Sequence, residues 1–209
     1  TGGVGDKVSL ILGPIMAACG CFVPMLSGRG LGHTGGTIDK LESIPGYRSD
    51  LPLKEFQRIV EETGLSIMGQ TDEICPADGK IYALRDVTTT VESIPLICGS
   101  ILSKKLAEGI QGLVMDIKWG NGAFMENIDD ARRLGDLIKS VGNNFDIKVQ
   151  ICFTSMHQPL GNACGLWCEI QESTLALQGN GPKDLMEVVN YLGKHALTMA
   201  NITNPVEKI

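Results

Sequence analysis

The residues best suited to chemistry lie in two glycine-rich runs that also carry hydroxyl side chains. Residues 27–42 read SGRGLGHTGGTIDKLE, and residues 1–9 read TGGVGDKVS. Glycines let backbone N–H groups approach an anion without an intervening Cβ, and hydroxyls add further donors. Two such runs in one short chain predict a phosphate held between them. On the residues alone, the alternative that each run is only a pair of turns stays open.

The composition is typical of a globular protein and argues against several classes of partner. Of the 209 residues, 43% are hydrophobic and 20% charged, with a net charge of −6, a balance that excludes a disordered chain. Negative net charge and an aromatic content of 5% argue against nucleic acid as a partner. No run of about 18 apolar residues occurs, so we expect no membrane span.

The cysteines indicate neither a disulfide framework nor a zinc site. There are seven of them at irregular spacing, unlike the even sets of disulfide-rich domains. Cys164 and Cys168 lie on one predicted helix, but no second Cys or His pair accompanies them, as a zinc site requires. We therefore expect buried thiols in a reducing compartment and a cytoplasmic protein without a bound metal.

Strand-like and helix-like segments alternate along the chain, which predicts an α/β fold. Strands are expected at 21–25, 65–68, 113–117 and 148–153. A long helical segment is expected at 86–108, broken or kinked at Pro95. The other expected helices are 6–19, 37–43, 53–63, 128–141, 166–177 and 182–199.

The longer glycine-rich run is similar to a known family signature, that of the thymidine phosphorylase and pyrimidine-nucleoside phosphorylase family. The signature reads S-G-R-G, two or three residues, then T-G-G-T-x-D-x-L-E. The resemblance continues in order along nearly the whole chain. Further matching segments are TGGVGD at 1–6, GQT at 69–71, PAD at 76–78, YALRD at 82–86 and SILSKK at 100–105.

This resemblance implies a fold of two lobes that close on a hinge. A mixed-sheet α/β lobe flanked by helices, here residues 1–68 and 111–209, holds phosphate. Residues 77–107 are expected to be an inserted segment of a second, all-helical lobe that holds the pyrimidine. The rest of that lobe and a C-terminal α+β region are expected outside this chain.

The resemblance also implies the reaction and its partners. The reaction is reversible phosphorolysis of thymidine, with uridine or deoxyuridine as further candidates, to a free base and a sugar 1-phosphate. The partners are therefore a pyrimidine nucleoside and inorganic phosphate. No cofactor is implied, because no electrons are transferred and no metal hydroxide is needed. A homodimer is expected for the full-length enzyme.

By the family motif, Ser9, Ser27 and Thr37 supply hydroxyls to the phosphate. The family also uses a lysine, a serine and a candidate general acid from a K-H-S motif that this chain lacks. Residues 1–209 alone are therefore expected to have little or no activity and to lose ordered dimerisation. An apolar helix face is also expected to be uncovered, formed by Val91, Ile94, Ile101 and Leu102.

Arg85, Ser100 and Lys104 match the family positions that hydrogen-bond the pyrimidine edge. Arg85 and Lys104 are also expected to be catalytic, because a cation stabilises charge growing on the departing base. Ser100 and Lys104 are four residues apart and fall on one helix face. On the residues alone, a solvated face or a salt bridge from Arg85 to Asp78 or Asp86 is an alternative. The remaining pyrimidine candidates are Tyr82 beside the base and an apolar wall of Leu31, Val91, Ile97 and Phe124.

Several positions depart from the family pattern. Lys7 stands where some bacterial members have a threonine and hold potassium through backbone oxygens and a glutamate aligned with Glu172. We expect the Lys7 ammonium to replace that ion and pair with Glu172, and the alternative is an exposed lysine on the first helical turn. Trp119 is bulkier than expected, and Cys98 and Gly99 stand where the family often has Thr and Ala, so the pocket shape can differ.

Two other functions are considered beside the phosphorylase. A phosphoribosyltransferase resembling the anthranilate enzyme shares the glycine-rich phosphate loop and the two-lobe plan. A non-catalytic binding module is the other alternative. Arg85, Ser100 and Lys104 favour the phosphorylase, because a base-binding site explains all three.

Overall fold

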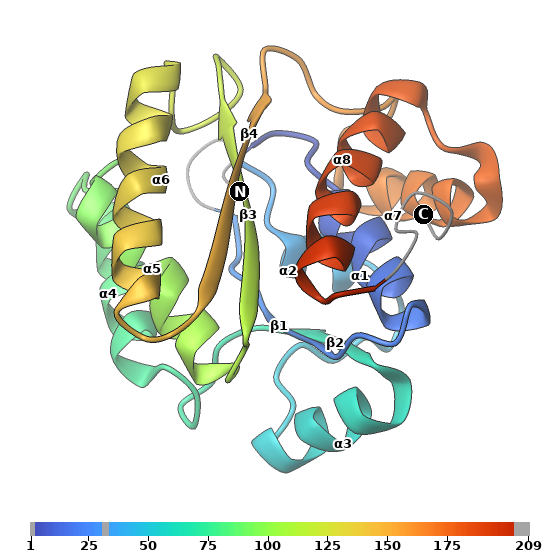
Figure 1. Ribbon diagram of the computed structural model, residues 1–209, viewed down its shortest axis with the longest axis horizontal. Helices are drawn as coiled ribbons and strands as arrows, with labels where there is room; N and C mark the ends of the chain where they lie inside the picture. Colours follow the sequence, from blue (N-terminus) through green and yellow to red (C-terminus); the bar gives the residue numbers. More distant parts are fainter. Residues whose placement is uncertain (1–2, 31–33, 203–209) are drawn as a thin grey trace.

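The computed structural model describes residues 3–30 and 34–202, and its architecture is α/β, as predicted (Figure 1). The described strands form two parallel pairs. Their bounds are β1 Val23–Leu26, β2 Leu65–Met68, β3 Gly112–Trp119 and β4 Lys148–Ser155. β1 pairs with β2, and β3 pairs with β4 along its whole length. Of the mixed sheet that the resemblance implies, the described residues contain the parallel part. Among the described residues, antiparallel pairing is limited to isolated bridges such as Gly3 with Ala123.

Helices connect the strands and cover both faces of the β3–β4 pair. α5 and α6 pack on one side of that pair, and α1 and α8 lie on the other (Figure 1). Burial on both faces explains the nearly continuous apolar run at 113–117 in β3. The helix bounds are α1 Val8–Ala18, α2 Thr37–Leu41, α3 Leu53–Thr63, α4 Pro76–Val87, α5 Ile94–Ala107, α6 Ile128–Asn143, α7 Leu166–Leu175 and α8 Lys183–Met199, with a π-helical turn at Ala176–Asn180.

Two apolar cores lie on the opposite faces of this strand pair. Ile117 of β3 packs with Leu134 and Ile138 of α6 in one core. Cys152 of β4 packs with Val189 of α8 in the other. Successive strand residues point to opposite faces, so one strand pair can contribute to both cores.

The long helix predicted for residues 86–108 is wrong in its bounds. α4 begins earlier, at Pro76, and ends at Val87, while α5 begins at Ile94. Between them Thr89 has a φ of 55°, a left-handed conformation that interrupts a helix. Pro95, the expected break, lies in the first turn of α5, where its missing N–H removes no intrahelical hydrogen bond.

The prediction that an apolar helix face is uncovered is also wrong. Leu102 is buried, and Ile94 and Ile101 pack against the core beside α6. Val91 is half-buried. Exposed apolar side chains lie on α4 instead, where Ile81, Leu84 and Val87 are 46%, 57% and 77% exposed.

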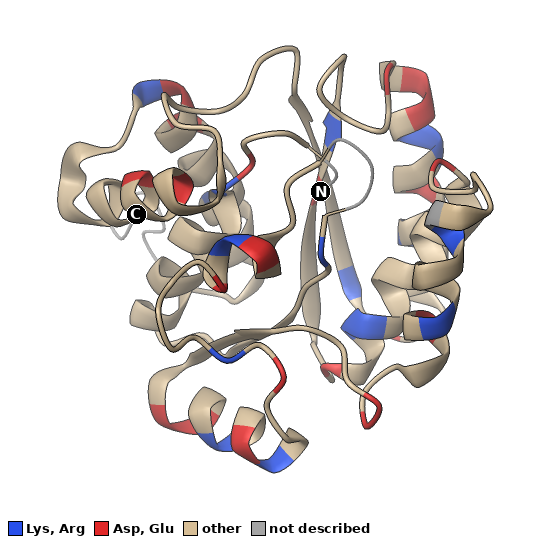
Figure 2. Cartoon of the chain, turned by 180° about the vertical axis from the view of Figure 1, so that it is seen from behind, with Lys and Arg blue, Asp and Glu red and all other residues tan. Residues whose placement is uncertain are grey.

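Charged residues of both signs are distributed over the helices, with Lys and Arg lying among Asp and Glu (Figure 2). With a net charge of −6, this distribution does not indicate a nucleic-acid surface. Within residues 3–30 and 34–202, no helix is long and apolar enough to cross a membrane.

Candidate active site

One cleft joins the two glycine-rich runs to α4 and α5. Its volume is about 1370 Å³. The phosphate candidates Ser9, Ser27 and Thr37 all line it. The structure therefore brings the predicted phosphate residues and most of the predicted pyrimidine residues to one cavity. The pyrimidine candidates that line the cleft are Tyr82, Arg85, Ile97, Ser100, Lys104 and Phe124.

The two other pyrimidine candidates are Leu31 and Val91. Leu31 lies outside the described residues. Val91 does not line the cleft, and its backbone oxygen accepts a hydrogen bond from Arg85 Nη2 instead. In place of an apolar wall, Val91 therefore contributes a carbonyl that holds the guanidinium.

The cleft is larger than a nucleoside and a phosphate require, because it extends between β1 and β3. Successive residues, 23–29 and 108–118, line it from both strands, and the described pairing joins neither strand to the other. Small-molecule cavities usually measure about 300–1,000 Å³. The chemically relevant part is the end beyond the carboxyl ends of the parallel strands, where open α/β sheets bind ligands. Ser27, directly after β1, lies at that end.

Glycines of the longer run are required by the packing of the run itself. A Cβ on Gly36 would lie 2.2 Å from the backbone nitrogen of Gly30. A Cβ on Gly28 would lie 3.0 Å from the Tyr82 hydroxyl. The Gly30 N–H also donates to Asp39 Oδ2 at 2.7 Å. The run therefore folds closely over the start of α2, an approach that larger residues would block.

Arg29 is held by carboxylates of its own run and is not available as a free phosphate ligand. Its Nη1 lies 2.6 Å from Glu42 Oε2 and 3.0 Å from Asp39 Oδ1. Hydrogen bonds from Arg29, and then from Ser49, lower the pKa of Glu42 to about 2. The same carboxylates raise the pKa of Arg29 above its ordinary value. The Arg29 guanidinium therefore stabilises the conformation of the longer glycine-rich run.

Lys104 is the centre of the pyrimidine-side group. Its Nζ donates to Asp78 Oδ2 at 2.6 Å and to Ser100 Oγ at 2.8 Å. Ser100 and Lys104 thus share a helix face, as their spacing predicts. Burial lowers the pKa of Lys104, and the hydrogen bond to Asp78 opposes that effect. The sequence interpretation did not assign Asp78 to Lys104, because the two residues lie on different helices.

Tyr82 lies beside both cations and connects α4 to the signature run. Its ring centre is 5.6 Å from Lys104 Nζ and 5.7 Å from Arg85 Cζ. Its hydroxyl donates to the backbone oxygen of Arg29 at 2.9 Å. Burial raises the pKa of Tyr82 to about 12, so the hydroxyl remains a donor at neutral pH.

Arg85 brings an unsatisfied donor to the cleft. The residue is buried, and its Nε has no hydrogen-bond partner within the described part of the chain. Burial lowers its pKa, while Tyr82 and Asp78 act in the opposite direction. The salt bridge to Asp78 that the sequence left open does not form, since Asp78 pairs with Lys104. A buried donor without a partner is uncommon and suits a site that receives an acceptor from a ligand.

Comparison with known proteins decides the family. The sequence model described as glycosyl transferase family, a/b domain, matches residues 1–208. The chain belongs to this family. The resemblance drawn from the glycine-rich signature is thereby confirmed.

Curated proteins similar to this chain include nucleoside phosphorylases. The chain is 51% identical over 193 residues to thymidine phosphorylase from Homo sapiens and 52% identical over 205 residues to thymidine phosphorylase from Colwellia psychrerythraea. It is 49% identical over 208 residues to pyrimidine-nucleoside phosphorylase from Staphylococcus haemolyticus. These alignments cover 92%, 98% and 100% of this chain but 40%, 47% and 48% of the relatives. The chain therefore spans less than half the length of the curated relatives it matches.

In this glycosyl transferase family member, Lys7 forms the predicted pair with Glu172. Its buried Nζ lies 2.5 Å from Glu172 Oε2 and donates to the backbone oxygens of Leu160 and Ala163, each at 2.7 Å. Burial acts to raise the pKa of Glu172, but Lys7 and backbone N–H groups outweigh it, so the pKa is lowered. The ammonium thus has the oxygen partners that a bound monovalent cation would use.

The departures noted in the sequence have little effect on the cleft. Trp119 packs edge-on against His157, with ring centres 5.1 Å apart, and does not line the cleft. Cys98 is buried in the core beside α6. A Cβ on Gly99 would meet nothing within 4 Å. None of these three residues lines the cleft.

A further lysine at the cleft could not be recognised from the sequence. Lys118 is buried at the end of β3, 2.6 Å from Asp116 Oδ2, and donates to Thr154 Oγ1 at 2.8 Å. Asp116 and Thr154 lie on neighbouring parallel strands, so only the strand register brings them together. In residues 3–30 and 34–202, no group of three or more His, Cys, Asp or Glu side chains could hold a metal ion.

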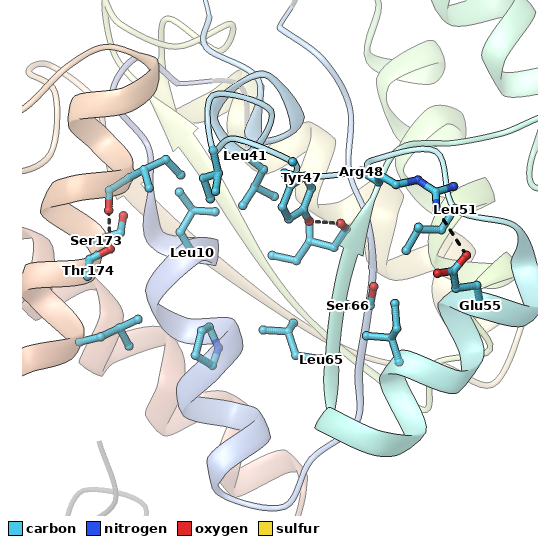
Figure 3. Close-up of a pocket in the computed structure, with 17 residues that line it drawn as sticks. Leu10, Leu41, Tyr47, Arg48, Leu51, Glu55, Leu65, Ser66, Ser173 and Thr174 are labelled. Carbon is cyan, nitrogen blue, oxygen red and sulfur yellow. Dashed lines mark hydrogen bonds and ion pairs between the residues drawn. The ribbon is translucent and has the colours of Figure 1, made fainter.

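A second, smaller cavity of about 520 Å³ lies among α1, α2, α3, β2 and α7 (Figure 3). Apolar side chains such as Leu10, Leu41 and Leu65 line most of it. Tyr47, also in its lining, donates its hydroxyl to the backbone oxygen of Ile67. None of the predicted phosphate or pyrimidine residues that the structure describes lines this cavity, so the larger cleft is the candidate active site.

The Lys7 arrangement predicts that Lys7→Thr makes the protein dependent on potassium. The variant leaves Glu172 and two carbonyl oxygens without their cation, and removing one partner of a buried pair typically costs about 3–5 kcal/mol. A bound ion would restore part of that stability. The measurement is the melting temperature in potassium chloride against choline chloride at equal ionic strength. We expect a rise in potassium for the variant and none for the wild type; equal responses would contradict the prediction.

The Lys104 cluster predicts that Asp78→Asn destabilises the folded chain by about 3–5 kcal/mol, because the buried ammonium loses its counter-charge. The hydrogen bond and negative charge of Asp78 raise the pKa of Lys104, so this pKa falls further in the variant. The unfolded chain then binds more protons, and the stability lost should be partly regained as pH rises towards 10. Urea denaturation at several pH values measures this. An exposed matched control is Asp129→Asn, for which we expect no comparable loss.

Proposed function

We propose that the full-length protein is a pentosyltransferase, a thymidine or pyrimidine-nucleoside phosphorylase, that carries out reversible phosphorolysis of thymidine, with uridine or deoxyuridine as further substrates. One observation carries this proposal. The hydroxyls of both glycine-rich runs and the Tyr82, Arg85 and Lys104 group line the same cleft. The names of the relatives, thymidine phosphorylase and pyrimidine-nucleoside phosphorylase, support the same reaction.

The proposed mechanism divides the work between the two sides of the cleft. Ser9, Ser27 and Thr37 hold phosphate so that one of its oxygens attacks C1′ of the sugar. The C1′–N1 bond breaks, and its electron pair leaves with the pyrimidine, giving a sugar 1-phosphate and a base that takes up a proton. Arg85 and Lys104 stabilise the charge that grows on the base. Donors already in place where charge develops lower the barrier without reorganisation.

We also assign the two sides to two lobes. Residues 1–68 and 111–209 form the phosphate lobe, and residues 77–107 belong to the helical pyrimidine lobe. In support, α4 and α5 follow one another with no strand between them. The hydrogen bond from Tyr82 to the Arg29 carbonyl would then join the lobes at the site.

The finer features of the assembled enzyme are proposals of the same kind. We infer a homodimer, supported by the exposed apolar residues of α4. We infer a cytoplasmic location, supported by cysteines that are all free. Salvage of pyrimidine nucleosides is the proposed role.

The alternatives receive less support. A phosphoribosyltransferase would use the same phosphate loops, but the Ser100–Lys104–Asp78 cluster is better explained by recognition of a pyrimidine edge. A non-catalytic binding module would retain both runs without turnover. Phosphate-dependent release of thymine from thymidine by the full-length protein separates these functions. Its absence at any phosphate concentration would refute the phosphorylase.

In the full-length protein, Arg85→Ala and Lys104→Ala should each lower kcat by about 10²–10³-fold, because one donor to the developing charge is lost. The effect on nucleoside binding should be smaller. Steady-state kinetics of thymine release measure both. Lys80→Ala, an exposed cation on the same helix as Arg85, is the matched control and should leave kcat unchanged. Near-wild-type turnover in either site variant would argue against the assignment.

Residues 1–209 alone should release little or no thymine. They lack the K-H-S motif, and loss of a general acid alone typically lowers a rate by about 10²–10⁴-fold. The measurement compares purified residues 1–209 with the full-length protein under the same phosphate and thymidine concentrations. Equal activity of the two would overturn the catalytic role given to the missing motif.

A further inference from the structure

Helix α7 carries two buried carboxylates, and each holds a lysine from one of the two glycine-rich runs. Glu172 pairs with Lys7 of the shorter run, at 2.5 Å. Glu169 pairs with Lys40 of the longer run, at 2.8 Å. Neither run is adjacent to α7 in sequence, so the helix is a common anchor for both. The Lys40–Glu169 pair has no role in the mechanism proposed above.

Lys40 also connects the two runs to each other. Its Nζ donates to the backbone oxygen of Asp6, in the shorter run, at 2.5 Å. A Cβ on Gly35 would lie 3.3 Å from Lys40 Cε, so the side chain runs directly beneath the longer run. Lys40 is only 1% exposed. One ammonium therefore contacts the shorter run, supports the longer run and is fixed by α7.

Glu169 is also buried, and its Oε2, 2.8 Å from Lys40 Nζ, makes the ion pair but no hydrogen bond within the described part of the chain. Its Oε1 accepts a hydrogen bond from the Gly165 N–H at 3.0 Å, and the residue is 2% exposed. Removing two charges from water is costly, and replacing a buried ion pair by apolar residues of similar volume is often neutral or stabilising. Stability alone is therefore a poor explanation for this pair. The contacts of the pair indicate another role, which is to set the spacing of the two glycine-rich runs.

We propose that Lys40 and Glu169 are positioning residues that set the distance between the two phosphate-binding runs. This inference rests on the proposed phosphorolysis. Thr37 begins the helix that carries Lys40, one turn before it, and Ser9 follows Asp6 by three residues. The contact from Lys40 to Asp6 therefore fixes the Thr37 and Ser9 hydroxyls relative to each other.

The pair should affect phosphate far more than the nucleoside. The pyrimidine-side residues lie on α4 and α5, and the described contacts of the Lys40 ammonium involve neither helix. A displacement of about 1 Å in a binding geometry can reduce a rate by about 100-fold. A change in the spacing of the runs should therefore appear in the KM for phosphate.

The test is the double variant Lys40→Met/Glu169→Leu in the full-length protein. An apolar pair of similar volume should keep the melting temperature close to that of the wild type. The KM for phosphate should rise by about 10–100-fold, as expected for the loss of one hydrogen bond to a charged ligand, while the KM for thymidine stays within about twofold. The matched control is Arg58→Met/Glu62→Leu, an exposed pair on α3, for which both KM values should be unchanged.

Two results would overturn the inference. One is an unchanged KM for phosphate in a folded double variant. The other is an equal rise in both KM values, which would indicate general loosening of the site. If the double variant does not fold, Glu169→Gln takes its place, because the amide oxygen can still accept from Gly165. The same two KM values then decide.

Failure of the proposed function is distinguishable from failure of this inference. A wild-type protein without phosphate-dependent thymine release would refute the phosphorolysis. Calorimetric titration with inorganic phosphate would then decide the role of the pair, since weaker binding by the double variant supports positioning. Equal phosphate affinity in the two proteins, or no phosphate binding by the wild type, would overturn it.

Discussion

Buried lysines that must be paired constrain much of this structure. Lys7, Lys40 and Lys118 are each about 1% exposed, and an ammonium removed from water is stable only with close oxygen partners. Those partners include the backbone oxygens of Leu160 and Ala163 and side chains of α7, β3 and β4. Satisfying three cations therefore fixes the opening run, α2 and the ends of the strands relative to each other. The walls of the cleft follow from that arrangement.

The cleft combines two chemically different surfaces. One side offers hydroxyls on tightly folded glycine-rich backbone, and the other offers Arg85 and Lys104 against the Tyr82 ring. Burial lowers the pKa of both cations, yet Asp78 partly compensates Lys104 through a direct hydrogen bond. A nearby anion would favour the charged form of each group. The electrostatics therefore suit a ligand that becomes more negative during reaction, as a departing pyrimidine does.

The differences from the sequence-based expectations have local and non-local causes. The predicted helix at 86–108 failed because Thr89 adopts a left-handed conformation, which apolar periodicity cannot reveal. The prediction of an uncovered apolar face on α5 failed because α6 packs over that face. Val91 turned from a wall residue into a carbonyl acceptor for Arg85. In each case a tertiary contact or one unusual dihedral angle decided the outcome.

The sequence by itself determined the α/β class, the family and the spacing of Ser100 and Lys104 on one helix face, since these depend on local periodicity and contiguous motifs. It also indicated the Lys7–Glu172 pair, although only through the resemblance. The tertiary structure alone decided that Asp78 pairs with Lys104, that Lys40 pairs with Glu169 and that Asp116 and Thr154 hold Lys118. The contacts of Asp78 with Lys104, Lys40 with Glu169 and Thr154 with Lys118 join separate elements, whereas Asp116 and Lys118 lie two residues apart on β3. Parallel strands, crossover connections and helix packing determine which charges meet, and no spacing along the chain encodes that geometry.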